Sequence, residues 1–501
     1  MKESHTRLVL IKPPQPGLIR GFTAGLISLA NYVTMRMPAC EAQILDLSDH
    51  SRAQASERVA NSCRRLQNER VFVGVTTSTA TYQAALSVAR IAKAAHPESI
   101  VVFGGPHASA DFATVLTEHE DLVDFVVIGE GEKPLCALLH NYPAIDNIPG
   151  IAVLSDGGIM RTPPPSPLST EELDSIPVTY GANGLVGTPG KFDHVTYVSA
   201  RGCPRECAFC SVGGAPIRTK SISAVVRDIG HLLDMGVSQI AIEDNFFAHS
   251  PGRTRGICQA LADISRRQHG MFAWDCQTRV EALARPDVIP LMADAGCDAV
   301  YIGVESVDTE HLRFLNKTNQ PTKYLKQLSG KVIPALLDSC IDCFLNLQFG
   351  LPGETAQHGE KTISFLGELG TEAQSRGKVI TVFPQLYVIY PGTRHCHKAF
   401  QQEHLPTDVF ESFTAWEARK PSLRLWLGEY FAHGAGGVPV GVLRSAPLRK
   451  GRYEIDCESM ARISTTLRKL DHLPGIRAFQ YSRYIVSEQD VKHHSKNVNS
   501  F

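Results

Sequence analysis

The sequence holds one tight group of cysteines, Cys203, Cys207 and Cys210, in the spacing C-x3-C-x2-C. The group follows an apolar run at residues 195–199, and the Gly and Pro within it help a short loop curl. Three converging thiolates can bind three irons of a 4Fe–4S cube and leave the fourth iron open. A zinc ion would need a fourth ligand, usually from a second close pair nearby, but the next cysteine, Cys258, lies 48 residues further along the chain. The pattern therefore favours a cluster over zinc or plain structural cysteines.

Ahead of this loop, residues 1–145 alternate short apolar runs with stretches of helical spacing. The runs lie at residues 7–11, 43–47, 71–75, 100–103 and 125–128. The helical stretches lie at residues 22–33, 54–66, 82–95 and 112–116. Nearly all-apolar runs are typical of parallel strands that are covered on both faces. Five such units predict a doubly wound α/β sheet.

Four loops that follow these strands are polar or rich in glycine, at residues 12–17, 76–79, 104–107 and 129–132. Ligands of such sheets sit beyond the carboxyl ends of the strands. Any one of these loops could be an ordinary tight turn with a helix cap. Four polar or glycine-rich loops at the same edge of the sheet predict a ligand site. Neither a Walker A motif nor GxGxxG occurs in these loops, which disfavours the nucleotide domains of those kinds.

The sequences KPP, GGPHAS and VIGEGE in these loops resemble the N-terminal cobalamin-binding domain of cobalamin-dependent radical S-adenosylmethionine enzymes. The motif Asp-x-His-x-x-Gly, which supplies a cobalt ligand in some corrinoid proteins, is absent. The resemblance therefore implies a corrinoid without a protein imidazole ligand, or none, and His107 is more typical of a loop or packing histidine. The implied cobalamin contacts are Pro14, Thr76, Thr77, Ser78, Thr79, Gly104, Gly105, His107, Gly129, Glu130, Gly131 and Glu132.

The cysteine motif itself is the hallmark of the radical S-adenosylmethionine superfamily. The resemblance implies that the open iron chelates the amino and carboxylate groups of S-adenosylmethionine. The reduced cluster then gives one electron to the sulfonium, and homolysis yields a 5′-deoxyadenosyl radical. Phe209, before the last cysteine, occupies the place of an aromatic residue that contacts the adenine. The protein contributes ligation, orientation and exclusion of quenching groups.

The superfamily also implies a partial (β/α)6 barrel over residues 194–398. Six candidate strands lie at residues 195–199, 239–243, 272–278, 299–305, 343–350 and 382–390. Helical stretches separate them at residues 223–234, 256–267, 286–294 and 355–369. Catalytic groups of parallel barrels lie at the C-terminal ends of the strands.

These strand ends carry motifs that resemble the superfamily's cofactor and substrate contacts. The implied S-adenosylmethionine contacts are Phe209, Glu243, Asp244, Glu305, Ser306, Gly350 and Pro352. The candidate substrate contacts are Gln277, Arg279, Tyr387 and Tyr390. Taken singly, each motif is typical of a turn, a helix cap or a salt-bridged barrel residue. Their order behind the cysteine loop favours the barrel.

Residues 146–193 carry many prolines and predict a linker with a small hairpin at 151–161. Residues 399–501 form a C-terminal α+β segment that, by the resemblance, shapes the substrate site. Lys+Arg is 50 and Asp+Glu is 51, which argues against a general nucleic-acid or anionic-membrane binder. No stretch approaches the ~20 apolar residues of a membrane span, and the N-terminus does not resemble a secretory signal. We expect a cytoplasmic protein whose 13 cysteines are mostly reduced thiols.

The resemblance implies a cobalamin-dependent methyltransferase that acts on an unactivated carbon or phosphorus centre of a small molecule or natural product. One S-adenosylmethionine would charge cobalamin to methylcobalamin, and a second would give the substrate-activating radical. The implied partners are the substrate and an external flavodoxin- or ferredoxin-like electron donor. A radical cyclase or oxidoreductase with the same layout is the alternative. A corrinoid or metal carrier without radical chemistry is disfavoured, because a carrier needs no barrel site.

Overall fold

The computed structural model describes residues 5–14, 24–48, 50–64, 69–178, 194–267, 272–351, 353–387 and 390–395, and the short stretches 465–466, 469–470 and 472–478. Pro352, residues 179–193 of the predicted linker and most of the C-terminal segment lie outside the described residues. The chain divides into two compact units, one over the described residues up to Val178 and one from His194. Each unit is described by itself.

The first unit is built on a seven-stranded sheet in the order β2-β1-β3-β4-β5-β6-β7. Its strands are β1 (His5–Lys12), β2 (Glu41–Asp46), β3 (Glu69–Thr76), β4 (Ile100–Gly104), β5 (Phe125–Val127), β6 (Ile151–Ser155) and β7 (Gly158–Arg161). The first five are parallel, which confirms the predicted doubly wound arrangement. Their apolar side chains are almost fully buried, as Leu8, Val9 and Leu10 are in β1.

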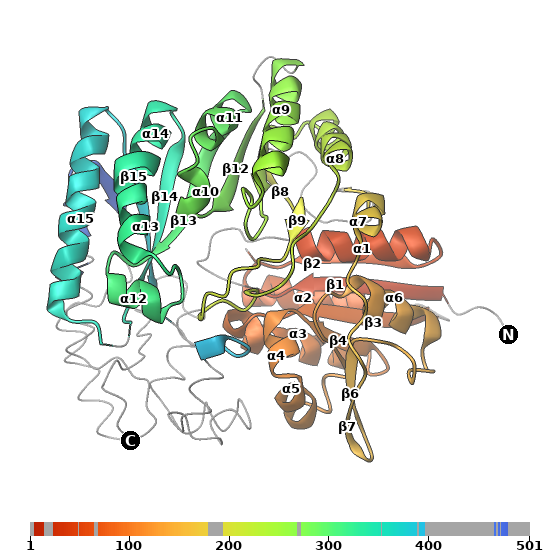
Figure 1. Ribbon diagram of the computed structural model, residues 1–501. Coiled ribbons are helices and arrows are strands. Elements are labelled where there is room, and N and C mark those ends of the chain that lie inside the picture. Colours follow the sequence, from red (N-terminus) through yellow and green to blue (C-terminus); the bar gives the residue numbers. More distant parts are fainter. Residues whose placement is uncertain are drawn as a thin grey trace, which may run out of the picture. The chain divides into compact units, whose positions relative to one another are not determined.

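Helices lie on both sides of this sheet, with α1 on one side and α2 and α3 on the other (Figure 1). The helices are α1 (Ala24–Arg36), α2 (Arg52–Cys63), α3 (Tyr82–Ala95), α4 (Pro106–Ala110), α5 (Phe112–Glu118), α6 (Glu132–Asn141) and α7 (Thr170–Ser175). A 3-10 turn, η1 (Thr79–Thr81), precedes α3. This coverage explains why the strands have no polar alternation.

The hairpin predicted in the linker forms as β6 and β7, and β6 pairs antiparallel with β5. It therefore extends the sheet of the first unit. The reason is physical: without β6, the short strand β5 would leave its backbone N–H and C=O groups unpaired at the edge of the sheet.

The second unit is built on a parallel sheet in the order β16-β15-β14-β13-β12-β11-β8. Its strands are β8 (His194–Tyr197), β11 (Gln239–Ile242), β12 (Ala273–Thr278), β13 (Cys297–Glu305), β14 (Asp342–Phe349), β15 (Ile380–Leu386) and β16 (Ile476–Ala478). Two further short strands, β9 (Ala200–Arg201) and β10 (Arg218–Thr219), form a separate pair.

The helices of this unit line one face of its sheet (Figure 1). They are α8 (Ile222–Asp234), α9 (Pro251–Arg267), α10 (Val280–Leu283), α11 (Val288–Asp294), α12 (Thr309–Phe314), α13 (Pro321–Gln327), a π-helical turn η2 (Leu328–Val332), α14 (Ile333–Asp338) and α15 (Ala356–Ser375). All six predicted strands of the partial barrel are present. Strand β16, from the C-terminal segment, is a seventh that the sequence pattern does not predict. No helix among the described residues is long and apolar enough to cross a membrane.

Substitution of Gly105 should destabilise the first unit more than substitution of Gly129. Both glycines have positive φ, at 96° and 82°. A Cβ at Gly105 would lie 2.6 Å from the backbone oxygen of Thr77, whereas one at Gly129 meets no atom within 4 Å. Gly129→Ala should cost about 1–2 kcal/mol from backbone strain, and Gly105→Ala about 3–4 kcal/mol. Urea unfolding followed by circular dichroism measures both, and equal costs would contradict the expected clash.

Candidate functional site

The cysteine loop of the second unit is held in a curled shape by its own backbone. Gly202 has a φ of 88°, and a Cβ there would lie 2.3 Å from the carbonyl oxygen of Pro216. Cys203 forms an isolated β-bridge with Gly213. The N–H of Cys210 donates to the carbonyl of Cys207 at 3.1 Å. These contacts close the loop on itself, so its three cysteines lie on one curled segment.

A buried arginine lies against this loop. Arg279 is 6% exposed, and its Nη1 lies 3.4 Å from Sγ of Cys207. Its Nη2 donates to Oε1 of Glu281 at 3.1 Å and to the carbonyl of Lys317. Burial alone would lower the pKa of Arg279, but the Glu281 carboxylate and the Cys207 thiol raise it above its ordinary value. The guanidinium is therefore a fixed positive charge beside the sulfur.

The donor set suits a 4Fe–4S cluster better than one metal ion. A single zinc ion holds thiolates about 2.3 Å from itself, so its sulfurs lie within about 4 Å of each other. In the described part of the chain, the sulfurs of Cys203, Cys207 and Cys210 do not all lie within 4.8 Å of one another, so they are too far apart for one zinc ion. Burial raises the pKa of the Cys210 thiol, with neighbouring cysteines adding to the effect. Bound iron would stabilise the thiolate form.

The end of β13 carries a buried ion pair. Oε1 of Glu305 lies 2.9 Å from Nζ of Lys317, and Gln348 Nε2 donates to Oε2 of Glu305 at 2.8 Å. Glu305 has a φ of 70°, a conformation that glycine favours. A Cβ at Gly303 would lie 2.6 Å from the Glu305 carboxylate and 2.7 Å from the Lys317 ammonium, so a side chain there would displace the pair. The strained backbone and the pairing together fix the direction of this carboxylate.

Glu243 and Asp244 follow β11 but have different surroundings. Asp244 is 1% exposed, and its oxygens accept from the N–H and Oγ of Ser199, both at 2.6 Å, and from the N–H of Ala200 at 2.7 Å. Burial raises its pKa to about 6, although these hydrogen bonds oppose the shift. Within the described part of the chain, no hydrogen bond or ion pair reaches the Glu243 carboxyl. Burial, then Asp275 and Asp244, raise its pKa to about 8.

Phe209 packs against a small apolar group made by Leu315, Leu351 and Tyr387. Tyr387 is 2% exposed, and its hydroxyl is hydrogen-bonded to Nδ1 of His395. These contacts place the aromatic ring of the cysteine loop beside the turn that follows β14. In that turn Gly350 and Leu351 donate their N–H groups to the carboxylate of Glu354.

The other predicted residues of this unit have less specific surroundings. Ser306 is 8% exposed, and its Oγ accepts from the N–H of Asp308 at 3.1 Å. Gln277 is exposed on β12. The carbonyl of Tyr390 accepts from Oγ1 of Thr393 at 2.7 Å. Pro352 lies outside the described residues.

In the first unit, two of the predicted ligand loops are bonded to each other. Thr77 is fully buried, and its Oγ1 donates to the carbonyl of Gly104 at 2.8 Å and accepts from the N–H of Ala108 at 3.0 Å. Nδ1 of His107 lies 3.1 Å from Oγ1 of Thr79. His107 is 2% exposed, and burial lowers its pKa to about 4. It also packs on the ring of Tyr82, with centroids 4.2 Å apart.

The remaining predicted cobalamin contacts vary in exposure. Gly129 is exposed, and its N–H donates to Oγ of Ser109 at 3.0 Å, which connects the loop after β5 to α4. Glu132 is 3% exposed and accepts from Oγ of Ser28 at 2.6 Å. Ser78 and Thr81 form a capping box at η1. Partial exposure is shared by Pro14, Thr76, Ser78, Thr79, Gly104, Gly105, Glu130 and Gly131.

Sequence reasoning missed Lys317, Gln348, Ser199 and Ser109. Each acts through a contact between elements that are distant in sequence, and no local spacing marks it. The sequence analysis did single out Arg279, as a substrate contact, but in the structure its guanidinium lies against the cysteine loop. We propose that its role is to balance charge there, which is an alternative to its predicted substrate contact.

Two family models match the chain. The B12 binding domain model matches residues 21–139. The Radical SAM superfamily model matches residues 197–366. The matched regions include strands β2–β5 of the first unit and strands β11–β14 of the second, together with the cysteine loop.

Three curated relatives are similar to the chain. An uncharacterized methyltransferase, PH0819, of Pyrococcus horikoshii is 28% identical over 81% of this chain and 86% of the relative. The hopanoid C-3 methylase of Methylococcus capsulatus is 29% identical over 46% of this chain and 44% of the relative. The anaerobic magnesium-protoporphyrin IX monomethyl ester cyclase of Rubrivivax gelatinosus is 28% identical over 58% of this chain and 53% of the relative. The chain thus spans about half the length of the latter two.

Among solved structures, the chain is similar to the radical S-adenosylmethionine methyltransferase TsrM of Kitasatospora setae, solved with tryptophan substrate and a cofactor analogue. The TM-score is 0.62 and the identity 18%, over 79% of this chain and 76% of TsrM. At this identity the likeness shows the fold alone.

Each of Cys203→Ala, Cys207→Ala and Cys210→Ala should lose the cluster. Anaerobically reconstituted wild-type chain should hold about four irons at this site, by the stoichiometry of a cubane. Each substitution removes one of three thiolate ligands. Iron analysis and the visible absorption spectrum measure the loss. Buried Cys276→Ala is the control, and a full cluster in the triple variant would contradict the assignment.

Substitutions at Glu243 and Asp244 should separate cofactor binding from structure. Glu243→Gln should weaken S-adenosylmethionine binding about tenfold, because it removes one charge-assisted interaction with an ammonium group. Asp244→Asn should lower stability by about 2–3 kcal/mol, because it disturbs three buried hydrogen bonds. Equilibrium dialysis and urea unfolding measure the two effects, and identical behaviour of the two variants would count against this division.

The same Glu243→Gln variant has a predicted pH signature. The folded chain keeps the Glu243 proton up to about pH 8, whereas the unfolded chain loses it near 4.5. The folded state therefore binds more protons between these values, and its stability falls as pH rises through this window. Relative to wild type, cofactor-free Glu243→Gln should gain thermal stability from pH 4.5 to 8. A constant difference in melting temperature would contradict the raised pKa.

Proposed function

Because the chain belongs to the radical S-adenosylmethionine enzymes that carry a B12-binding domain, we propose that it is a cobalamin-dependent methyltransferase. Its substrate is an unactivated carbon, or a phosphorus centre, of a small molecule or natural product. The observation that carries the proposal is the presence in one chain of both matched domains, with a curled three-thiol loop in the second. Relatives named as methyltransferases or methylases support methyl transfer.

The bound groups supply the difficult chemistry: the cluster and S-adenosylmethionine a radical, and cobalamin a transferable methyl group. The residues of the chain bind and orient them. Cys203, Cys207 and Cys210 would hold the cluster, and Arg279 would balance its negative charge. Glu243 would take the ammonium group of S-adenosylmethionine, because its carboxyl has no partner among the described residues and a cation beside it would lower its raised pKa.

At the first unit, the loops after β3, β4 and β5 would hold cobalamin. The exposed glycine at Gly129 allows close approach of a ligand to the backbone. The side chain of His107 is packed on Tyr82 and hydrogen-bonded to Thr79. These contacts support a corrinoid whose cobalt has no imidazole ligand from this residue. An external flavodoxin- or ferredoxin-like protein would supply the electrons.

A radical cyclase is the second candidate, because a cyclase is also among the relatives at 28% identity. It would use the same cluster and cobalamin loops. The two functions differ in the fate of the methyl group of S-adenosylmethionine, which a methyltransferase removes and a cyclase leaves in place.

An assay that needs no substrate separates these two functions. The reconstituted chain is loaded with cobalamin, reduced with titanium(III) citrate and given S-adenosylmethionine. A methyltransferase should release S-adenosylhomocysteine, up to about one equivalent per bound cobalamin, because cobalamin accepts the methyl group. Protein without cobalamin is the control. Formation of 5′-deoxyadenosine without any S-adenosylhomocysteine would reject methyl transfer and favour the cyclase.

A further inference from the structure

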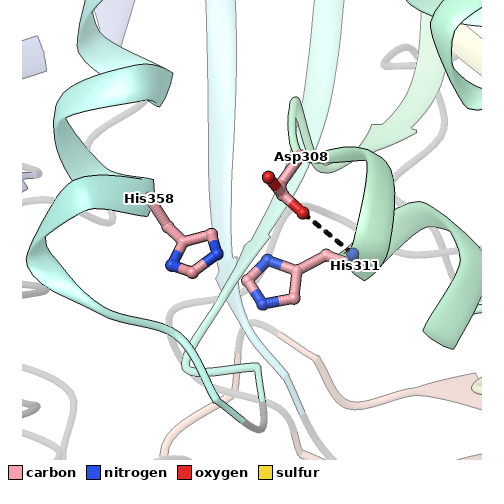
Figure 2. A group of neighbouring side chains, drawn as sticks. All are labelled: Asp308, His311 and His358. Atoms are coloured by element: carbon pink, nitrogen blue, oxygen red, sulfur yellow. Dashed lines mark hydrogen bonds between the residues drawn. The ribbon is translucent and has the colours of Figure 1, made fainter.

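Two histidines and an aspartate converge outside the cysteine loop. Asp308 precedes α12, His311 lies in its first turn, and His358 lies in the first turn of α15. One ligand atom from each lies within 4.8 Å of the other two. Figure 2 shows the two imidazole rings facing each other from different helices, with the Asp308 carboxylate beside His311. From this convergence we propose that Asp308, His311 and His358 bind a divalent cation of the zinc type.

The ligand chemistry fits such an ion. Two imidazole nitrogens and one carboxylate oxygen are a set that zinc binds, with its fourth position left for water. The rings of His311 and His358 have centroids 4.5 Å apart and planes inclined at 30°. The ring of His311 has no hydrogen bond from the described part of the chain. Mainly because of burial, its pKa is lowered to about 4, so the ring is neutral at pH 7.

Thr355 can orient the His358 ring for ligation. The Thr355 N–H donates to Nδ1 of His358 at 3.0 Å, and Oγ1 of Thr355 lies 2.8 Å from the same nitrogen. Ligation through Nε2 needs the proton on Nδ1, which would then donate to Oγ1 in place of accepting from the Thr355 N–H. Hydrogen bonds of this kind fix the tautomer of ligating histidines. The ion would therefore bind the tautomer of His358 that carries its proton on Nδ1.

Lys361 competes with the ion for Asp308. Its Nζ lies 2.8 Å from Oδ2 of Asp308, and its side chain is half exposed. Oδ1 of Asp308 accepts from the N–H groups of Glu310 and His311 at 2.8 and 3.1 Å. The lysine can withdraw into solvent, which frees Oδ2 for a cation while Oδ1 keeps its contacts with the helix. Removal of the lysine charge should therefore tighten metal binding.

The ion would connect two segments that carry predicted cofactor contacts. Asp308 donates its N–H to Ser306, which follows Glu305 at the end of β13. His358 lies just after the glycine-rich turn that follows β14. A cation between α12 and α15 would hold these strand ends together. This role is separate from radical chemistry and does not depend on the proposed methyl transfer.

Zinc titration of the full-length, cluster-loaded chain tests the proposal, because iron then occupies the cysteine loop. His358→Gln keeps a side chain that can accept from the Thr355 N–H, so its helix cap should survive. Lys361→Met removes the competing charge. His231→Ala, at an exposed position in α8, is the matched control. A chromophoric chelator measures affinity, and X-ray absorption at the zinc edge identifies the ligands.

Wild-type chain should bind one zinc ion through nitrogen and oxygen at about 2.0–2.1 Å. His358→Gln should weaken binding at least tenfold, Lys361→Met should tighten it at least threefold, and His231→Ala should leave it unchanged. Zinc bound through sulfur, no zinc bound by wild type, or unaltered affinity in both His358→Gln and Lys361→Met would overturn the proposal.

Discussion

The buried guanidinium of Arg279 lies against the cysteine loop, where we propose that it balances the negative charge of the ligating thiolates. It lies 3.4 Å from the Cys207 sulfur and also donates to the carbonyl of Lys317. The ammonium of Lys317 pairs with Glu305, which accepts in turn from Gln348. A single series of polar contacts thus joins the loop to the ends of β12, β13 and β14. It depends on the parallel register, which brings these strand ends to one edge.

Opposite charges beside the buried groups explain why they can be buried together: Arg279 pairs with Glu281, and Lys317 pairs with Glu305. An unpaired buried charge is costly, whereas a paired and hydrogen-bonded one is tolerated. Glu243 is the exception, because its carboxyl has no partner among the described residues and its pKa is raised to about 8. The cost of ionising it would be relieved by a cation. The fold therefore leaves the Glu243 carboxyl suited to receive a positively charged ligand group.

Local patterns in the sequence predicted the cysteine loop and the five parallel strands of the first unit, and together with the family resemblance they predicted six strands of the second. They predicted less about individual roles. Glu243 and Asp244 are neighbours in one motif, yet Asp244 is engaged by Ser199 and Ala200 while Glu243 is not. Lys317 and Gln348 gain their roles only through tertiary contacts. Strand β16 has three residues, too few for a periodic signal, and it forms only because β15 offers an edge to pair with.

The loops of the first unit show the same separation between pattern and role. Their glycines and hydroxyls were predictable, but several hydroxyls hold the rim together and do not face outward. Thr77 bonds Gly104 and Ala108, and Ser109 bonds Gly129. A rim whose loops are tied to one another is already ordered before a ligand arrives. Since ordering loops on binding costs affinity, such a rim suits a large rigid ligand such as a corrinoid, which can be held by backbone groups and shape without an imidazole on the metal.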